Sequence, residues 1–239
     1  MNASDLRLDL HNHTAFSSDG LMSPSVLLQT ARKRGVGCIA VTDHNTVEGA
    51  LECLALAEAD PTLPRVIPGV EISTADGDVI ALFVKESIPR GLPALETMAL
   101  IRERGGLVYL PHPHDSVRRG TISSRVREQA AAAADVVEVL NGKSLSPWSV
   151  RNSDRLAARH GRPRGAGSDA HARSEVGRAY VVVERQPTCD DLVALVAAGQ
   201  LREGLHWHEY LANWALQPLA GVTKFRRKSG RKLSKLVSP

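Results

Sequence analysis

The stretch Asp9-Leu-His-Asn-His-Thr-Ala-Phe-Ser-Ser-Asp-Gly20 overlaps an apolar run, Leu6-Arg7-Leu8-Asp9-Leu10, that predicts a short β-strand. The strand delivers His11 and His13, which are two residues apart, so on an extended chain both imidazoles point to the same face. Asp19 adds a carboxylate soon after. Imidazole and carboxylate are ligand types of a divalent-metal site. A single pair of histidines is weak evidence, so the interpretation depends on the later strands.

Short apolar strands alternate with helices along the rest of the chain. Strands are predicted at 38–42, 66–71, 79–84, 107–110, 136–140, up to 167 and at 180–183; helices are predicted at 23–34, 47–58, up to 104, 122–134, 148–160 and 190–198. This alternation favours an α/β fold with a mostly parallel sheet. Seven or eight short strands in about 200 residues favour a barrel over an open sheet. Pro68 predicts an edge or irregular position for its strand.

Residues of metal-ligand type stand at the ends of six of these strands. They are His11 and His13, Asp43 and His44, Glu71, His112, Asn141, and Asp169 and His171. In a β/α barrel the carboxyl ends of the parallel strands meet on one face, which carries the site. Each group alone has an ordinary structural explanation, but together they predict a metal centre. The donors are nitrogen and oxygen without thiolate, which suits Mn, Zn or Fe(II) and is compatible with Mg.

Composition places the chain among globular proteins. Its 239 residues are long enough for a substantial core, 43% are hydrophobic and only 4% are aromatic. Three cysteines without CxxC spacing, Cys38, Cys53 and Cys189, predict reduced thiols and a cytoplasmic location. We predict neither a signal peptide nor a transmembrane segment.

The basic charge belongs to the C-terminal end. The whole chain has a formal charge of +4, and the segment after residue 223 contributes seven Lys and Arg, so residues 1–223 carry −3. Trp207, Tyr210, Leu211 and Trp214 are spaced as one face of a helix. We predict a first domain over 1–204 and, over 205–239, an amphipathic helix with a basic tail. The tail is either a solvated segment or a contact for nucleic acid or anionic lipid.

Six motifs in order resemble the PHP (polymerase and histidinol phosphatase) family over about residues 6–184. They are His11-x-His13, Ser18-Asp19-Gly20, Thr42-Asp43-His44-Asn45, Pro68-Gly69-Val70-Glu71-Ile72, His112-Pro113 and Gly167-Ser168-Asp169-Ala170-His171. The chain is most similar to the stand-alone bacterial phosphoesterases of that family. The resemblance implies a distorted (β/α)7 TIM-like barrel, here followed by the C-terminal helix and basic tail, and hydrolysis of phosphate esters.

The same resemblance implies a site with two or three divalent metal ions. His11, His13, Glu71 and Asp169 resemble ligands of a first metal, and Glu71 resembles the bridge to a second metal held with His112. Asp19, His44 and His171 resemble ligands of a third metal. A hydroxide bridging the metals would attack phosphorus. Asn141 departs from a histidine or similar ligand that several members carry after this strand. The short interval between Leu110 and Asp135 implies that no large cap domain covers the site.

Three further residues are candidates for roles beside the metals. Asp43 is either an orienter of a metal-bound histidine or a proton acceptor. His114 and Arg178, with Asn141, are candidate contacts for substrate phosphate, a role that suits arginine's bidentate donors.

The predicted substrate is a small phosphomonoester such as a nucleotide, or the end of a short oligonucleotide. Histidinol phosphate is an alternative substrate. Two alternatives of other classes are a non-catalytic nucleic-acid-binding or regulatory protein on the same scaffold and a hydrolase of C–N bonds. The sequence leaves these alternatives open.

Overall fold

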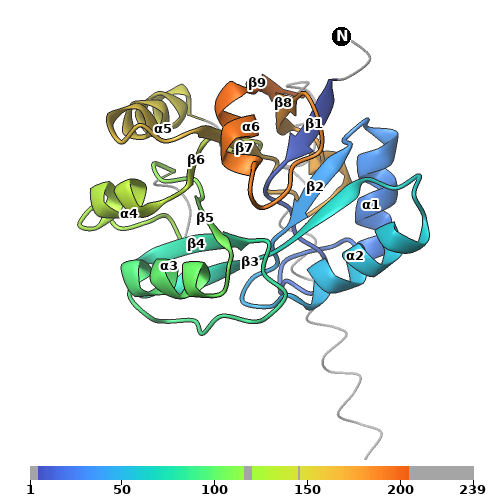
Figure 1. Ribbon diagram of the computed structural model, residues 1–239, viewed down its shortest axis with the longest axis horizontal. Coiled ribbons are helices and arrows are strands. Elements are labelled where there is room, and N and C mark those ends of the chain that lie inside the picture. Colours follow the sequence, from blue (N-terminus) through green and yellow to red (C-terminus); the bar gives the residue numbers. More distant parts are fainter. Residues whose placement is uncertain (1–4, 116–119, 145, 205–239) are drawn as a thin grey trace, which may run out of the picture. The chain divides into compact units, whose positions relative to one another are not determined.

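The computed structural model describes residues 5–115, 120–144 and 146–204 (Figure 1). The strands are β1 (Leu6–Asp9), β2 (Cys38–Val41), β3 (Arg65–Thr74), β4 (Gly77–Leu82), β5 (Leu107–Leu110), β6 (Val136–Asn141), β7 (Arg164–Gly167), β8 (Ala179–Val183) and β9 (Gln200–Glu203). The helices are α1 (Pro24–Lys33), α2 (Glu48–Ala59), α3 (Ala94–Glu103), α4 (Arg127–Ala133), α5 (Pro147–Arg159) and α6 (Leu192–Ala198). None of the helices in these ranges is long and apolar enough to cross a membrane.

All nine described strands belong to one sheet, in the order β7-β6-β5-β4-β3-β2-β1-β8-β9. Strands β1, β2 and β3 pair in parallel, as do β5, β6 and β7, and β4 runs antiparallel between the two groups. The hairpin β8–β9 adds two antiparallel pairings. The prediction of a mostly parallel sheet was therefore wrong, because the tight β3–β4 turn before Gly77 reverses the chain within the sheet. The six strands that carry the predicted site still run in one direction.

Hydrogen bonds join the segment after β1 to β7, which stands at one end of the strand order, and to the residues that follow β7. The amide of Leu10 donates to the carbonyl of Ala166, and the amide of His13 donates to the carbonyl of Ala170. Between them, the amide of Asp169 donates to the carbonyl of His11 at 2.7 Å. The sheet is therefore nearly closed, in agreement with the predicted TIM-like barrel of an α/β protein. Closure also places the β1 and β7 ends of the predicted site side by side.

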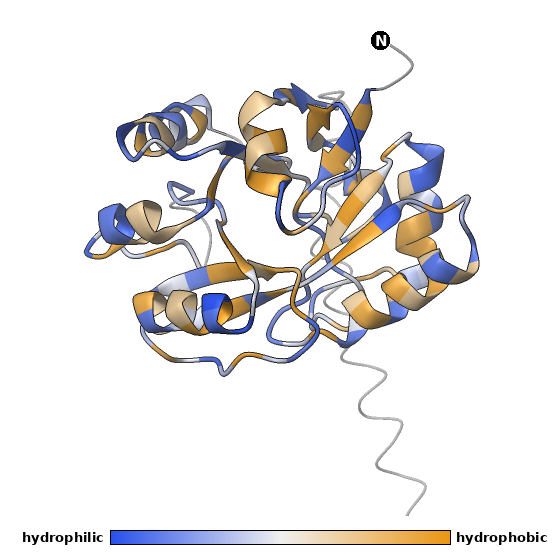
Figure 2. Cartoon of the chain, in the orientation of Figure 1, coloured by the Kyte–Doolittle hydropathy of each residue, from blue (hydrophilic) through white to orange (hydrophobic). Residues whose placement is uncertain are grey.

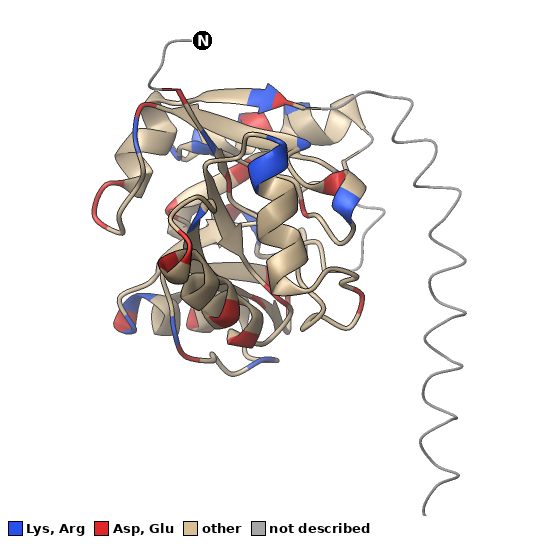
Figure 3. Ribbon diagram, turned by 90° about the vertical axis from the view of Figure 1, so that its right-hand side faces the viewer, with Lys and Arg blue, Asp and Glu red and all other residues tan. Residues whose placement is uncertain are grey.

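Helices α1 to α5 cover the outside of this sheet, as α1 shows (Figure 1). Ser23 caps the first turn by accepting from the amide of Val26, and Pro24 occupies the first helical position. Leu27, Leu28 and Ala31 are completely buried in a core cluster that also contains Ile39 and Val41 of β2. Figure 2 shows the matching pattern, with apolar strands and helices whose outer faces are more hydrophilic. Figure 3 shows charged residues mostly on helices and loops.

A second core cluster fills the space between the strands with aliphatic side chains and Tyr109. Leu8, Leu10, Ala40 and Leu82 belong to it and are completely buried. The core is poor in aromatic side chains, in keeping with an aromatic content of 4%. A third cluster packs the sheet against α3, α4 and α5.

Several predicted elements differ in extent. Pro68 lies inside β3, but the pairing of β3 with β2 ends at Pro68 and the pairing with β4 begins at Gly69, so no ladder bond is lost. The helix predicted over 122–134 begins only at Arg127, and β9 was not predicted because Gln200–Glu203 is polar and largely exposed. Residues 5–204 belong to one compact unit. The predicted helix and tail over 205–239 lie outside the described residues.

Candidate metal centre

Four buried donor groups meet at the carboxyl-end face of the strands. His11 and His13 follow β1, Glu71 lies in β3 and Asp169 follows β7. Nε2 of His11 lies 3.1 Å from Nε2 of His13 and 3.3 Å from Oε2 of Glu71. Nε2 of His13 lies 3.3 Å from the same oxygen of Glu71 and 3.5 Å from Oδ1 of Asp169. The four side chains therefore form one enclosed cluster.

The hydrogen bonds of Nδ1 in His11 and His13 show which nitrogen of each neutral ring carries the proton. They leave the lone pair of Nε2 pointing into this cluster. Nδ1 of His11 lies 3.2 Å from Oε1 of the buried Glu138, and a carboxylate only accepts, so this nitrogen carries the proton. The hydroxyl of Ser17 donates to Asp43 at 2.6 Å, so its oxygen accepts from Nδ1 of His13, 3.1 Å away. In each neutral imidazole Nε2 is then the unprotonated nitrogen. Two such nitrogens beside two carboxylates need a cation between them.

Glu71 connects this cluster to two further histidines. Its Oε1 lies 3.2 Å from Nε2 of His112, which follows β5. Its Oε2 lies 3.2 Å from Nδ1 of His44, which follows β2. Both oxygens of Glu71 therefore face imidazoles, as expected for a carboxylate that bridges two metal ions.

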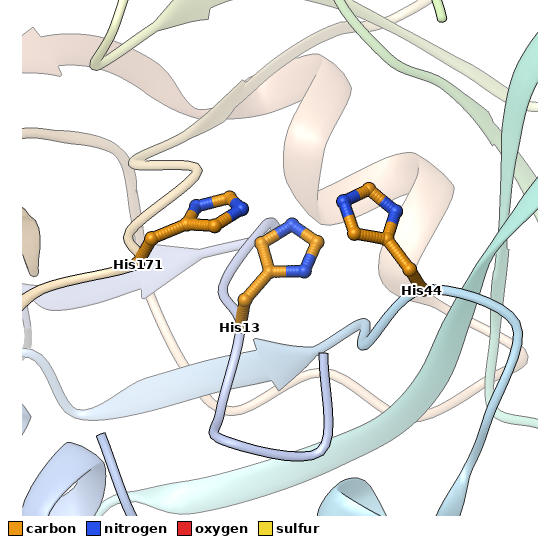
Figure 4. Close-up of side chains that lie close together, drawn as sticks. All are labelled: His13, His44 and His171. Carbon is orange, nitrogen blue, oxygen red and sulfur yellow. The ribbon is translucent and has the colours of Figure 1, made fainter. Parts of the chain in front are cut away.

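The remaining two predicted ligands lie at the more open side of the cluster. Oδ2 of Asp19 lies 3.2 Å from Nε2 of His171 and 3.8 Å from Nε2 of His44. The rings of His171 and His44 flank that of His13, as Figure 4 shows. Among the described residues, three groups have ligand atoms within 4.8 Å of one another: His11, His13 and Asp169; His11, Glu71 and His112; and His13, His44 and His171. The donor atoms of these groups are nitrogen and oxygen, which suit divalent ions.

The electrostatics of the cluster also favour positive charge. Burial alone would lower the pKa of His11, but the carboxylates of Glu71 and Glu138 raise it to about 9. Burial alone would raise the pKa of Glu71, but the neighbouring imidazoles, led by His11, lower it well below its usual range. The pKa of His13 is lowered by burial and by His171. The cluster therefore favours positive charge, although it does not raise the pKa of every histidine in it.

Two of the candidate ligands have a left-handed backbone. The φ angle is 51° at Asp169 and 29° at His112. Non-glycine residues in this region carry a conformational cost, and such residues concentrate at functional sites. The cost is met here by fixed contacts, since the amide of Asp169 donates to the carbonyl of His11 and the amide of His112 donates to Glu138.

Sequence reasoning did not select Glu138 or Lys143. Glu138 is the charged residue within the apolar run Val136-Val-Glu-Val-Leu140, and that interruption was the available signal. Lys143 follows β6, and its Nζ lies 3.7 Å from Oδ1 of Asp169 and in hydrogen-bonding contact with Nδ1 of His171. An isolated lysine in a loop carries no such signal, because only the fold places it against two candidate ligands.

Asp43 and Asn141 lie directly behind the candidate ligands. Asp43 is completely buried and accepts hydrogen bonds from the amides and hydroxyls of Thr14 and Ser17. The Asn141 side-chain amide donates to Glu138 at 2.9 Å and to Asp169 at 3.2 Å. These contacts hold neighbouring side chains in position.

The described contacts of His114 and Arg178 are with other parts of the chain. His114 lies against α5, where its carbonyl accepts from the hydroxyl of Ser149 and its ring meets Trp148 edge-on. Burial, followed by the charges of Arg127 and Arg159, lowers the pKa of His114 to about 4. Arg178 is 2% exposed, and its Nε donates to the carbonyl of Ser174. A substrate-phosphate contact by either residue stays a prediction.

Comparisons with known sequences identify relatives along most of the chain. A family model described as PHP-associated matches residues 147–201. The protein described as Uncharacterized protein MJ0417 from Methanocaldococcus jannaschii is 33% identical over 179 residues, which cover 74% of this chain and 70% of that protein. The 5'-3' exoribonuclease Rnm of Salmonella typhimurium is 41% identical over 66 residues, which cover 28% of this chain and 22% of that enzyme.

A solved structure shares the fold. The two-domain protein from Bacteroides vulgatus that contains a predicted PHP-like metal-dependent phosphoesterase superposes with a TM-score of 0.67 at 19% identity. The match covers 83% of this chain and 65% of that protein.

Proposed function

Because the chain belongs to the PHP family of metal-dependent phosphoesterases, we propose that it hydrolyses phosphate monoesters, with a nucleotide or the end of an oligonucleotide as substrate. Support for the nucleotide class comes from the similarity to the exoribonuclease, whose name states its action on RNA. Histidinol phosphate is the alternative substrate within the same reaction class.

The observation that carries the proposal is the set of imidazole nitrogens and carboxylate oxygens directed at one another. Nε2 of His11 and Nε2 of His13 lie 3.1 Å apart, beside the carboxylates of Glu71 and Asp169. Their proton-bearing nitrogens are already bonded to Glu138 and Ser17. Divalent ions would satisfy this arrangement, in place of the proton that the carboxylates of Glu71 and Glu138 otherwise favour on His11.

We assign metal binding to the eight predicted ligands. His11, His13, Glu71 and Asp169 would hold one ion, Glu71 and His112 a second, and Asp19, His44 and His171 a third. Bound divalent ions lower the pKa of a water ligand and neutralise charge on a phosphoryl group. Mn, Zn and Fe(II) suit these ligands, and Mg is compatible with the carboxylates.

Lys143 is assigned to the phosphoryl group of the substrate. Its side chain is 19% exposed, and its ammonium nitrogen lies 3.7 Å from Oδ1 of Asp169 at the edge of the cluster. Lys143 brings the positive charge that an arriving phosphate dianion requires, next to Asp169 and His171. Asn141 would orient Asp169 through its amide.

The test is phosphate release by the protein loaded with Mn2+. The panel contains nucleoside monophosphates, 3′,5′-bisphosphates, 5′-phosphorylated oligonucleotides, histidinol phosphate and an aryl phosphate, with an amide substrate to detect C–N hydrolysis. We expect release from a nucleotide substrate, loss of release in Asp169→Ala, and an increase in KM in Lys143→Met with unchanged metal content. Turnover of the amide alone, or of no substrate at all, would contradict the proposal.

A further inference from the structure

One face of α5 combines an exposed aromatic ring with a line of arginines. Trp148 is 58% exposed, the most exposed of the large hydrophobic side chains in the described residues. Arg151, Arg155 and Arg159 are also exposed and follow it at intervals of three, four and four residues, which places all four on one side of a helix. At about 1.5 Å per residue the face is roughly 16 Å long. We call these four residues the α5 face.

The opposite side of α5 fixes the helix to the segment that carries a candidate metal ligand. Ser149 and Ser153 are buried, and the Ser149 hydroxyl donates to the carbonyl of His114 at 2.7 Å. The ring of Trp148 lies 6.2 Å from that of His114, at an interplanar angle of 88°. His114 is two residues from His112. The Trp148 end of the α5 face is therefore anchored to the segment that carries His112, and the arginines follow further along the helix.

The charge of the α5 face is only partly compensated. Arg159 pairs with Glu128 at 2.5 Å. The side chains of Arg151 and Arg155 form no ion pair or hydrogen bond with other described residues. The one acid within α5, Asp154, is occupied by Arg164 at 2.8 Å. The face therefore presents two unpaired guanidinium groups in line with an exposed indole.

We propose that the α5 face binds single-stranded nucleic acid, one base stacking on Trp148 and the backbone phosphates following the arginines. An aromatic platform combined with a line of positive charge is the chemistry by which proteins hold single strands without reading their sequence. A lipid surface fits less well, because membrane-bound helices insert a broad apolar face, whereas Trp148 is the one large hydrophobic side chain that α5 exposes and Leu156 is buried. The proposal rests on the proposed function, in that the strand would enter with its phosphorylated end at the metal centre.

Binding is measured apart from hydrolysis. The probe is a fluorescein-labelled, 5′-phosphorylated ten-nucleotide RNA, and the readout is fluorescence anisotropy in the inactive Asp169→Ala background. Trp148→Ala and the double variant Arg151→Glu/Arg155→Glu are each expected to weaken binding at least tenfold. The double variant is also expected to lower the dependence of log K on log salt by about 1.4, because about 0.7 is lost for each phosphate contact of a single strand.

The matched control carries the same charge change on another part of the surface. Lys33 ends α1 and Arg65 begins β3, and both are exposed at the end of the fold opposite the metal centre. Lys33→Glu/Arg65→Glu is expected to change the affinity less than twofold. An equal loss of affinity in the control and in the α5 double variant would overturn the proposal, and so would unchanged RNA binding with loss of binding to phosphatidylserine vesicles.

Turnover separates this proposal from the proposed function. In the active protein, Arg151→Glu/Arg155→Glu is expected to leave kcat/KM for a nucleoside monophosphate unchanged and to raise KM for the oligonucleotide at least fivefold. If no nucleotide is hydrolysed, the proposed function fails, while the anisotropy measurement still reports on the α5 face. A parallel loss for both substrates would overturn the α5 assignment.

Discussion

The carboxylate of Glu138 organises the metal centre at the scale of single residues. Besides facing Nδ1 of His11, it accepts from the hydroxyl of Tyr109 at 3.0 Å, from the amide of His112 at 2.7 Å and from the side chain of Asn141 at 2.9 Å. One buried group thus fixes the tautomer of one candidate ligand and the backbone of another. Replacing a residue that hydrogen-bonds to a metal ligand typically lowers metal affinity about 10–100-fold.

Replacing Glu138 by glutamine tests this role. The Glu138→Gln variant keeps the size of the side chain but removes the charge that holds the proton on Nδ1 of His11. We expect the affinity for Mn2+ to fall about 10–100-fold, measured by titration calorimetry of the metal-free protein.

Glu58→Gln serves as the control, because Glu58 is exposed on α2 and carries the same substitution. Equal Mn2+ affinities for the two variants would refute the role of Glu138.

The loop between β1 and α1 shows how one element is held by the end of another. Asp43, directly after β2, accepts from the amide of Thr14 at 2.7 Å and from its hydroxyl at 2.6 Å. It also accepts from the amide and hydroxyl of Ser17. The oxygen of Ser17 in turn accepts from the amide of His44 at 3.0 Å. The loop that carries His13 and Asp19 is thereby fixed to the end of β2.

These contacts predict that Asp43 contributes to folding stability as well as to the site. Asp43→Asn replaces an acceptor of four hydrogen bonds with an amide whose NH2 group faces donors. We expect the free energy of unfolding of the metal-free protein to fall by roughly 2–4 kcal/mol, since buried hydrogen bonds to a charged group contribute about 1.5–3 kcal/mol each and adjust in part. The measurement is urea denaturation.

The alternative role of Asp43, as a proton acceptor only, makes the opposite prediction. In that case Asp43→Asn would abolish turnover and leave the urea midpoint of the metal-free protein unchanged.

At the scale of the whole molecule, the metal centre joins segments that are far apart in the chain. Its candidate ligands come from the ends of β1, β2, β5 and β7, and from within β3. Gly167 permits the closest approach, because a Cβ there would lie 2.3 Å from Cβ of His11. Ions bound at this junction would hold the nearly closed sheet together.

Removal of metal is therefore expected to destabilise the protein. A ligand at 100 times its Kd contributes about 2.7 kcal/mol, which for a protein of this size corresponds to a Tm difference of roughly 5–10 °C. We expect this decrease when the Mn2+-loaded protein is treated with EDTA in a calorimetric scan. Asp169→Ala should show a much smaller difference, and a Tm unaffected by EDTA in the unmodified protein would argue against resident ions.

The basic C-terminal segment is expected to be dispensable for the chemical step. Deletion of residues 222–239 should leave kcat/KM for a mononucleotide within twofold, since the predicted site lies within residues 11–178. The measurement is steady-state phosphate release. A large loss of activity on the mononucleotide would assign the segment a part in catalysis.

Local patterns in the sequence determined most of the elements and the general location of the site. Alternating apolar runs predicted the strands from β1 to β8 and six helices, and the polar residues after those strands predicted a site on the carboxyl-end face. Helices and strands can be predicted in this way because their periodicity is a property of neighbouring residues. The reversed direction of β4 and the β8–β9 hairpin could not be predicted in this way, since strand direction depends on which distant strands pair.

Only the tertiary structure decided which residues stand behind the predicted ligands. Asp43 and Asn141 were candidates for several roles, and their contacts became specific once Thr14, Ser17 and Asp169 were brought to them. Glu138 and Lys143 had no sequence motif, because the candidate ligands that they contact lie far away in the chain: His11 is 127 positions from Glu138, and His171 is 28 positions from Lys143. The sequence by itself specified residue types that are able to bind metal. Their protonation and their order around the centre depend on hydrogen bonds that exist only after the sheet has closed.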